Sequence, residues 1–383
     1  MTSPSRQAYA VATQTPGLTE ESLAEARSLI GIWLRREHFR WNDTVAPDSV
    51  RHFCYGLSDT NPLWLDPEYA AGTRFGGLVA PPTFLYSVDR GHVAPRLRGV
   101  QWIYAGARWE FYRPLPMGLQ LDSRAQLVDA RWVKGSKARN MILQEGEVQY
   151  LGSDGELVAR ALTRIFRIPR ARADGGLSYS RREPHNYTPE DVERIEDAID
   201  AEEVRGSRPR YWTDVHVGDR LPAVVKGPLN MSDMIMFYAG VGCFYLAHEM
   251  AWRWRRRHPA DAYMDPKTGT QDHPARGHTE EFMAGEVGMP GPYDSGLQRV
   301  CWLGQVCTNW MGDDGDLVDL DVRLRRPNVF GDTQFCDGVV TGKRDGGLID
   351  VALKATNQSG EVGSEATATV RLPVSAASDG SGR

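Results

Sequence analysis

The stretch Ser58–Asp66, which reads SDTNPLWLD, is the most informative part of this chain. It places the carboxylate of Asp59, the amide of Asn61 and a stiffening proline within four residues. Such a sequence makes a good turn, so a capping role for Asp59 is the simple alternative to a functional one. General acid/base work on a water molecule usually needs a second titratable group at hydrogen-bond distance. Trp64 stands where that partner would be sought, so the stretch indicates a site with one member missing.

Helical and strand patterns surround this stretch. A helical patch over 49–57 precedes it, and a second helix is predicted to start after Pro82. Long strands then run from 102 to 168, with clear alternation of apolar and polar residues over 145–150 and 160–168. The chain therefore combines helices with a sheet of consecutive strands.

The same order of elements returns in the second half, which indicates an internal repeat. Segments 113–118 and 326–331 each hold an Arg-Pro pair with a glycine four residues after the proline. Segments 53–59 and 237–243 each run six residues from a phenylalanine to the loop position. The second half has one extra segment, about 254–285, between its loop and its second helix. This insertion is either a lid over a pocket or a surface elaboration or oligomer contact.

These patterns divide the chain as follows: an N-terminal helical extension (1–40), a first unit (41–172), a charged linker (173–209), a second unit with the insertion (210–373) and a disordered tail (374–383).

Composition narrows the class of protein. The chain has 383 residues, 41% of them hydrophobic, and a net charge of -5, as expected for a folded globular protein without an electrostatic footprint for nucleic acid. No apolar run is long enough to span a membrane, and residues 1–17 do not read as a signal peptide, so we expect a cytoplasmic protein. The five cysteines form no Cys-x-x-Cys pair, so neither a disulfide framework nor a zinc site is predicted.

The segment 53–70 (FCYGLSDTNPLWLDPEYA) together with 75–82 (FGGLVAPP) resembles the MaoC-like dehydratases, which are hotdog-fold hydratases and dehydratases of acyl thioesters. The resemblance is specific over about residues 48–90. Two such units in tandem resemble the double-hotdog members of that family. The implied fold is α+β, with two long central helices wrapped by one continuous antiparallel β-sheet.

In that family the loop reads Gly-Asp-x-Asn-Pro-hydrophobic-His, and the Asp and His together activate a water. Asp59 matches the acid and Trp64 occupies the histidine position. In the second unit His248 matches the histidine, whereas Cys243 takes the acid position and Tyr245 the amide position. Each unit therefore resembles half of a dyad.

Family members also use a backbone N–H at the start of the second helix to stabilise the enolate oxygen. Gly296 fits that place in the second unit. Pro82 takes it in the first, and proline has no N–H to donate. The resemblance thus implies that Asp59 and His248 are catalytic and that Asn61, Trp64, Tyr245 and Gly296 bind substrate, with no metal.

Equivalent positions of a repeat belong to separate sites, so Asp59 and His248 are not expected to form one dyad. Each site would recruit a substitute partner. The candidates are Tyr55, Tyr69 and Asp66 near Asp59, and Asp233, Asp294 and Tyr245 near His248. His248 itself has a simple alternative, because a lone histidine in an apolar helix is commonly a core residue.

Three function classes follow. The first is an acyl-thioester hydratase or dehydratase, acting on enoyl-CoA or 3-hydroxyacyl-CoA, with Trp64 shaping a pocket for a bulky or aromatic acyl group. The second is altered chemistry on the same scaffold: a thioesterase, an isomerase or a lyase of specialised metabolism. The third is a catalytically silent thioester-binding subunit. The expected partners are acyl-CoA or an acyl-carrier thioester and further copies of the chain in a homodimer or higher homo-oligomer, with neither nucleic acid nor membrane; no cofactor is implied.

Overall fold

The computed structural model describes residues 18–36, 40–97, 100–134, 140–169, 181–242, 246–258, 263–265 and 267–374. The helices of the first half are α2 (Glu20–Arg27), α3 (Pro47–Leu57), α4 (Pro62–Leu65), α5 (Pro67–Ala71) and the 3-10 helix η1 (Pro82–Ser87). Its strands are β1 (Val79–Ala80), β2 (Val100–Phe111), β3 (Leu115–Pro116), β4 (Leu121–Lys134), β5 (Asn140–Gly152) and β6 (Leu157–Pro169).

The second half adds the helices α6 (Pro189–Asp200), η2 (Trp212–Asp214), α7 (Met231–Val241), α8 (His248–Arg257), η4 (Pro274–His278), α9 (Glu281–Glu286) and α10 (Gly296–Met311). Its strands are β7 (Arg220–Lys226), β8 (Tyr263–Met264), β9 (Gln271–Asp272), β10 (Asp316–Leu324), β11 (Gln334–Arg344), β12 (Leu348–Asn357) and β13 (Val362–Arg371).

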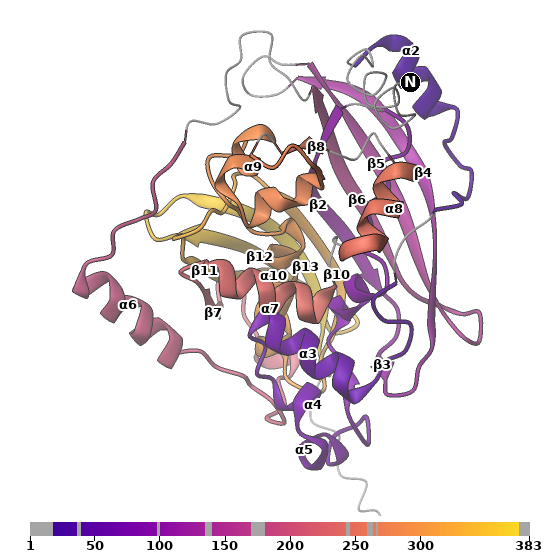
Figure 1. Ribbon diagram of the computed structural model, residues 1–383. Helices are drawn as coiled ribbons and strands as arrows, with labels where there is room; N and C mark the ends of the chain where they lie inside the picture. Colours follow the sequence, from indigo (N-terminus) through magenta and orange to yellow (C-terminus); the bar gives the residue numbers. More distant parts are fainter. Residues whose placement is uncertain are drawn as a thin grey trace, which may run out of the picture.

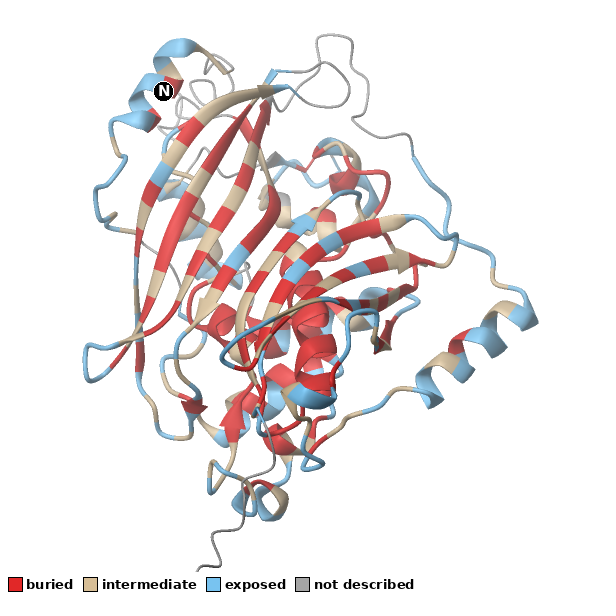
Figure 2. Cartoon of the chain, turned by 180° about the vertical axis from the view of Figure 1, so that it is seen from behind, coloured by how far each residue is buried: buried red, intermediate tan, exposed pale blue. Residues whose placement is uncertain are grey.

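One antiparallel sheet runs through both halves of the described chain. Its nine strands follow the order β4-β5-β6-β2-β10-β13-β12-β11-β7. The halves join where β2 pairs with β10, and the ion pair between Arg108 Nε and Asp319 Oδ2 (2.8 Å) crosses this seam. Alternate residues of the strands face the core, as Figure 2 shows from behind. The sheet predicted from the sequence alternation is therefore continuous across the two units.

Helix α10 lies at the centre of the fold. Every residue from Leu297 to Met311 is buried, because α10 contacts β2, β7 and all of β10–β13 while α3 and η1 pack beside it. Figure 1 shows α10 on the concave side of these strands, with α7 and α3 next to it. A helix enclosed on all sides is expected to be mainly apolar. α10 is so except for five buried polar residues, Gln298, Arg299, Gln305, Thr308 and Asn309.

The described residues of the first unit form no helix of similar length. η1 covers only six residues, although the family resemblance implies a long helix there. The chain leaves the helix because Asp89 is held from several sides: its carboxylate accepts from Gly91 N and Ser123 Oγ, each at 2.9 Å, and pairs with Arg36. Its carbonyl accepts from Tyr150 Oη at 2.5 Å. Of the two long central helices expected, only α10 is long.

Helices α3 and α7 pack closely at two glycines. A Cβ on Gly56 would lie 2.7 Å from the carbonyl oxygen of Met236, and a Cβ on Gly240 would lie 2.1 Å from that of His52. Each helix thus has a glycine, and so no side chain, at the point where the other helix crosses it. This contact fixes α3 and α7 relative to each other.

The connecting segments lie outside this core. The described part of the linker binds the second unit, because Tyr187 Oη donates to the carbonyl of Gly331 at 2.8 Å. Helix α6 lies apart on the surface with Ile195 as its buried residue (Figure 1). Between α7 and α10 the predicted insertion folds into α8, the short hairpin β8–β9, η4 and α9.

Candidate active site at the Asp59 loop

Asp59 follows directly on the end of α3. Ser58 closes the helix in the left-handed conformation (φ 54°), and the Asp59 N–H donates to the carbonyl of Cys54 at 3.0 Å. Asp59 Oδ1 accepts from Asn61 N at 3.2 Å, and Asn61 Oδ1 accepts from Leu63 N at 3.0 Å as the N-cap of α4. The local sequence therefore makes the turn expected of it, with Asn61 as the helix cap. It also buries the Asp59 side chain, which is 6% exposed.

Two residues of the second unit hold this loop. Lys226 Nζ, at the end of β7, donates to the carbonyls of Leu57 (2.9 Å) and Ser58 (2.8 Å). Gln305 Nε2, on α10, donates to the same Ser58 carbonyl at 3.2 Å. No sequence pattern indicates either residue, because both lie far from the loop along the chain and belong to no local motif.

Asp59 lines a small enclosed space between the loop, η1 and α10. The space has a volume of about 10 Å³, close to what one water molecule requires. Thr83, Cys301 and Gln305 also line it, and Gln305 Oε1 is buried without a hydrogen bond to any described residue. The carboxylate and these polar groups are suitable partners for a single water.

A larger cavity of about 200 Å³ adjoins this space and shares Pro82, Thr308 and Leu317 with it. Asn61 and Trp64 lie in its wall. The rest of its wall is mainly apolar and comes from both units: Leu63, Phe75, Val79, Leu85, Phe111, Leu115, Val158, Met311 and Leu317. Three arginines also line it: Arg74, Arg113 and Arg371. Asp313 and Asp316 line it as well; Arg74 pairs with Asp316, and Arg113 pairs with Asp154. The cavity thus combines an apolar interior with charged groups of both signs.

Trp64 is buried in the wall of the larger cavity, with 4% of its surface exposed. Its indole N–H makes no hydrogen bond of ordinary geometry, but it lies close enough to the Asp59 carboxylate to favour the charged form. An indole can donate to the carboxylate but cannot accept a proton from water. Trp64 therefore occupies the expected place of a histidine without its acid/base chemistry.

The electrostatic surroundings of Asp59 act in opposite directions. Burial is the largest effect and raises the pKa of this carboxyl above its ordinary value. The Asn61 N–H, the Lys226 ammonium and the Trp64 indole lower the pKa, whereas the Glu202 carboxylate raises it. A carboxyl whose pKa is shifted in this way next to a cavity is a candidate acid/base group.

The other sequence-predicted site residues lie elsewhere. His248 begins α8 and is exposed, and no hydrogen bond or ion pair within the described chain joins it to Asp59. Gly296 begins α10, where a Cβ would lie 2.6 Å from Leu324 Cδ1 and 2.9 Å from Tyr104 Cδ1. Tyr245 and Cys243 lie outside the described residues. The structure thus brings together Asp59, Asn61 and Trp64, while His248 and Gly296 do not line their cavity.

The proposed substitutes for the missing histidine are engaged in other contacts. Tyr55 is 55% exposed, Tyr69 Oη donates to Asp313 Oδ2 at 2.6 Å, and Asp66 Oδ1 caps α5 by accepting from Glu68 N at 2.9 Å. Pro82 has no N–H, so the first backbone donor of η1 is that of Thr83, which also lines the space beside Asp59.

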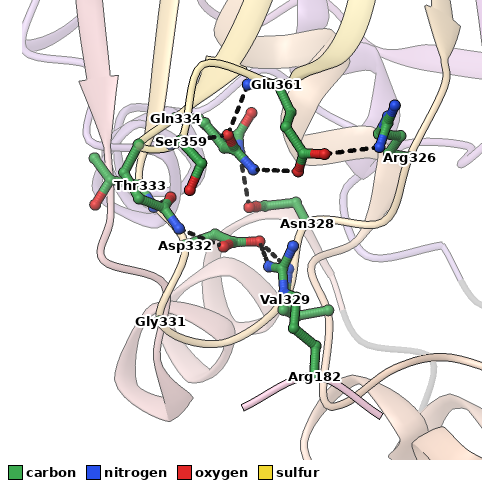
Figure 3. Close-up of polar contacts among 12 residues, drawn as sticks. Arg182, Arg326, Asn328, Val329, Gly331, Asp332, Thr333, Gln334, Ser359 and Glu361 are labelled. Carbon is green, nitrogen blue, oxygen red and sulfur yellow. Dashed lines mark hydrogen bonds and ion pairs between the residues drawn. The ribbon is translucent and has the colours of Figure 1, made fainter. Parts of the chain in front are cut away.

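The second unit has a polar network near the start of its central helix. Asp294 is buried beside Arg299 (Oδ2 to Nε, 2.9 Å), and Asn328 Nδ2 donates to the same oxygen at 3.1 Å. Gln334 Nε2 donates to Asn328 Oδ1 at 3.0 Å, and the network continues to Asp332 and the linker residue Arg182 (Figure 3). Burial raises the pKa of Asp294 to about 6. This end of the second unit is filled by internal contacts.

No set of three or more His, Cys, Asp or Glu side chains is arranged to bind a metal ion in the described part of the chain. Among the same residues, no helix has the length and apolar character needed to cross a membrane. The expected cytoplasmic location and homo-oligomeric state stay predictions.

Comparisons with known proteins agree with this architecture. The FAS1-like, dehydratase domain region matches residues 28–161. A UPF0336 protein of Parafrankia sp. (strain EAN1pec) is 32% identical over 123 residues, which make up 30% of this chain and 78% of that protein. A UPF0336 protein of Streptomyces avermitilis is 26% identical over 139 residues, or 34% of this chain and 87% of that protein.

Among solved structures, one titled MaoC-like dehydratase has a TM-score of 0.62 and 21% identity, covering 91% of this chain and 99% of its own. A conserved hypothetical protein from Mycobacterium tuberculosis with a double hotdog fold has a TM-score of 0.52 and 14% identity, covering 88% of this chain and 96% of its own. The double hotdog fold expected from the sequence is confirmed.

Proposed function

We propose that this chain, which belongs to the family of the UPF0336 proteins and has the double hotdog fold of a MaoC-like dehydratase, adds water to an enoyl thioester or removes it from a 3-hydroxyacyl thioester. One observation carries the proposal. The buried Asp59 carboxylate faces a space of about 10 Å³, the size of one water, next to an apolar cavity of about 200 Å³. A reacting water and an acyl chain would therefore lie side by side.

The reaction can proceed with one carboxylate. In the hydration direction Asp59 takes a proton from water while the water oxygen bonds to C3 of the enoyl group. The electron pair of the double bond moves toward the thioester carbonyl and forms an enolate. The protonated Asp59 then gives its proton to C2, so that one O–H bond and the C=C π bond have been replaced by a C–O and a C–H bond and the carboxylate is restored.

The enolate oxygen needs a hydrogen-bond donor, because its negative charge develops in a cavity with little water. Pro82 cannot supply one. The Thr83 N–H in the first turn of η1 is the nearest backbone donor along the chain and lines the space beside Asp59. We assign it this role.

The walls of the cavity indicate the substrate class. Leu63, Phe75, Leu85 and Phe111 favour an apolar acyl chain, and Trp64 gives one wall an aromatic surface. Arg74 and Arg113 are paired with Asp316 and Asp154, so Arg371, which has no ion pair with a described residue, is the lining cation that favours a thioester whose carrier arm bears phosphate, as in coenzyme A and carrier proteins. We therefore expect an acyl-CoA or acyl-carrier thioester as substrate.

The test is an enoyl-CoA series of increasing chain length, including an aromatic member, with loss of the conjugated enoyl absorbance as the readout. The purified protein should hydrate at least one member of the series. Asp59→Asn should retain the fold and lose most of the rate. Hydration that is unaffected by this substitution would rule out the proposed site.

A second candidate, a thioester-binding subunit without chemistry of its own, is favoured by one observation: Trp64 fills the histidine position and cannot take a proton. Its signature would be binding of a non-reactive acyl-CoA by the purified protein, with hydration appearing only after a second protein is added. Trp64→His would then also create activity in the isolated chain. If the isolated wild-type chain already hydrates enoyl-CoA, this second candidate is excluded.

A further inference from the structure

We propose that Lys226, contributed by the second unit, is the positioning and charge-balancing partner of Asp59, the role left open by Trp64. The inference rests on the proposed function in taking Asp59 as the acid/base group. It adds a residue that no sequence motif indicates and that lies in the other half of the chain.

The geometry places the lysine directly under the catalytic loop. Lys226 is the last residue of β7 and is 7% exposed. Its ammonium donates to the carbonyls of Leu57 and Ser58, and Ser58 is the neighbour of Asp59 in the chain. Lys226 and Asp59 form no direct ion pair within 4.0 Å in the described structure, yet each shifts the pKa of the other. Lys226 therefore acts through space and through the peptide that carries Asp59.

A capping role alone does not explain a lysine at this position. The last carbonyls of a helix can be satisfied by water or by any neutral donor, and Gln305 already supplies a neutral amide to Ser58. Removing an ammonium from water costs several kcal/mol unless a negative charge offsets it. The end of a helix carries only a partial negative charge. Burial lowers the pKa of Lys226, and the carboxylates of Glu202 and Asp59 oppose that effect, Glu202 more strongly than Asp59.

The other titratable groups around Asp59 and Lys226 are a carboxylate and three thiols, so Lys226 supplies the positive charge of this cluster. On the Lys226 side lie Glu202, whose Oε1 accepts from Val225 N at 2.7 Å, and the thiol of Cys336. On the Asp59 side lie the thiols of Cys54 and Cys301. Burial raises the pKa of all three thiols, so they are neutral at pH 7. Two carboxylates, Asp59 and Glu202, thus share the charge of one lysine.

The proposal predicts a specific change in the pH dependence of hydration. Without Lys226 the pKa of Asp59 rises further, so the active carboxylate form is present only at higher pH. Lys226→Met should move the acidic limb of the kcat/KM profile upward by about one pH unit, which reduces activity about 10-fold at a pH on that limb. The lost rate should return at higher pH. Lys226→Arg should restore most of the wild-type profile.

Two further variants keep the test decisive. Lys226→Gln retains a hydrogen-bond donor and loses the charge, so it replaces the Met variant if that protein does not fold. Lys343 is a matched control, because its Nζ donates to the carbonyl of Val215 at 2.6 Å and lies over the ring of Trp212. Lys343→Met also removes a lysine–carbonyl contact but should leave the pH profile in place. An unchanged profile in Lys226→Gln would overturn the proposal.

A readout that needs no activity separates this inference from the proposed function. In a double-mutant cycle of Asp59→Asn and Lys226→Gln, chemical unfolding should show an interaction between the two sites at pH 7, because the proposal requires both groups to be charged there. The interaction should disappear near pH 3, where Asp59 is protonated. An interaction that is absent at pH 7, or equal at both pH values, contradicts the partnership. An active Asp59→Asn protein contradicts the proposed function whatever the cycle shows.

Discussion

The two units share one sheet and one strand order, but they use the start of their central helix differently. In the first unit this start is Pro82 of η1, which borders both the space beside Asp59 and the larger cavity. In the second unit it is Gly296 of α10, which is packed against Tyr104 and Leu324. One end is open to a ligand and the other is closed by the protein itself.

The turns that follow β2 and β10 also differ. In the first unit Arg113 and Pro114 line the cavity. In the second unit the corresponding Arg326 is 60% exposed and pairs through Nη1 with Glu361 Oε1 at 2.8 Å, and Asn328, next to Pro327, belongs to the buried part of the network in Figure 3. The comparison teaches that a doubled scaffold can keep a site in one half and convert the equivalent region of the other into structure.

The sharpest way to test this contrast is to remove the acid of one unit and the histidine of the other. Asp59→Asn should lower the hydration rate by about 10²–10⁴, the usual contribution of a general acid/base group. His248→Ala should change it little, because the imidazole is exposed and lies outside the cavity. Steady-state rates on the best enoyl-CoA would show the difference. A large loss with His248→Ala and none with Asp59→Asn would move the active site to the second unit.

Substitutions at the closed end, near the start of α10, should lower the stability of the protein and affect its activity little. Arg299→Met leaves the Asp294 carboxylate buried without its cation and should lower the free energy of unfolding by about 3–5 kcal/mol. Arg113→Met removes the partly exposed pair with Asp154 and should change stability little. Urea unfolding of both variants gives the comparison. Equal losses would mean that the second network is no more structural than the first pair.

The sequence predicted the part of the site that is local and missed the part that is not. The Asp59–Asn61–Pro62 turn, Trp64 and Pro82 form one continuous motif, so their grouping follows from their order in the chain. Lys226 is 169 residues from Leu57, and Gln305 is 247 residues from Ser58. No local pattern connects such positions, and only the folded sheet brings them to the loop.

The length of η1 was missed for a similar reason. Apolar periodicity favours a helix after Pro82, but contacts from Arg36 and Ser123 hold Asp89 and turn the chain away. Tertiary contacts of this kind override local propensity. Gly296 was placed correctly at the start of a helix by its position in the repeat, but the side chains of Tyr104 and Leu324 that crowd it come from distant strands.

A smaller effect on stability tests the contact between α3 of the first unit and α7 of the second. Gly240→Ala would place a Cβ against the His52 carbonyl and should cost about 1–3 kcal/mol by overpacking the α3–α7 crossing. Gly285→Ala, in α9, meets no atom within 4 Å and should be neutral or slightly stabilising. Thermal unfolding distinguishes the two. A neutral Gly240→Ala would show that α3 and α7 can move apart freely.

The smallest expected effect is a pH-dependent change in stability. The pKa of Asp59 is higher in the folded than in the unfolded protein. Its contribution to the free energy of unfolding is therefore most favourable at a pH below the unfolded-state pKa, and it is lost as the pH rises through the folded-state pKa. Asp59→Asn should therefore be more stable than the wild type at pH 7, with the gap closing near pH 3. Melting temperatures across this range give the answer. A gap that widens toward low pH would reverse the assigned shift.

The cross-unit hydrogen bonds to the Leu57 and Ser58 carbonyls also set when the site can first exist. During synthesis the Asp59 loop leaves the ribosome well before Lys226 and Gln305 are made. At about 5–20 residues per second, the 169 and 247 residues that separate these pairs correspond to roughly 10–50 s. Throughout that interval the two carbonyls lack the donors that hold the loop in the folded protein. The space beside Asp59 also needs residues of α10, so it can close only after most of the second half has been made.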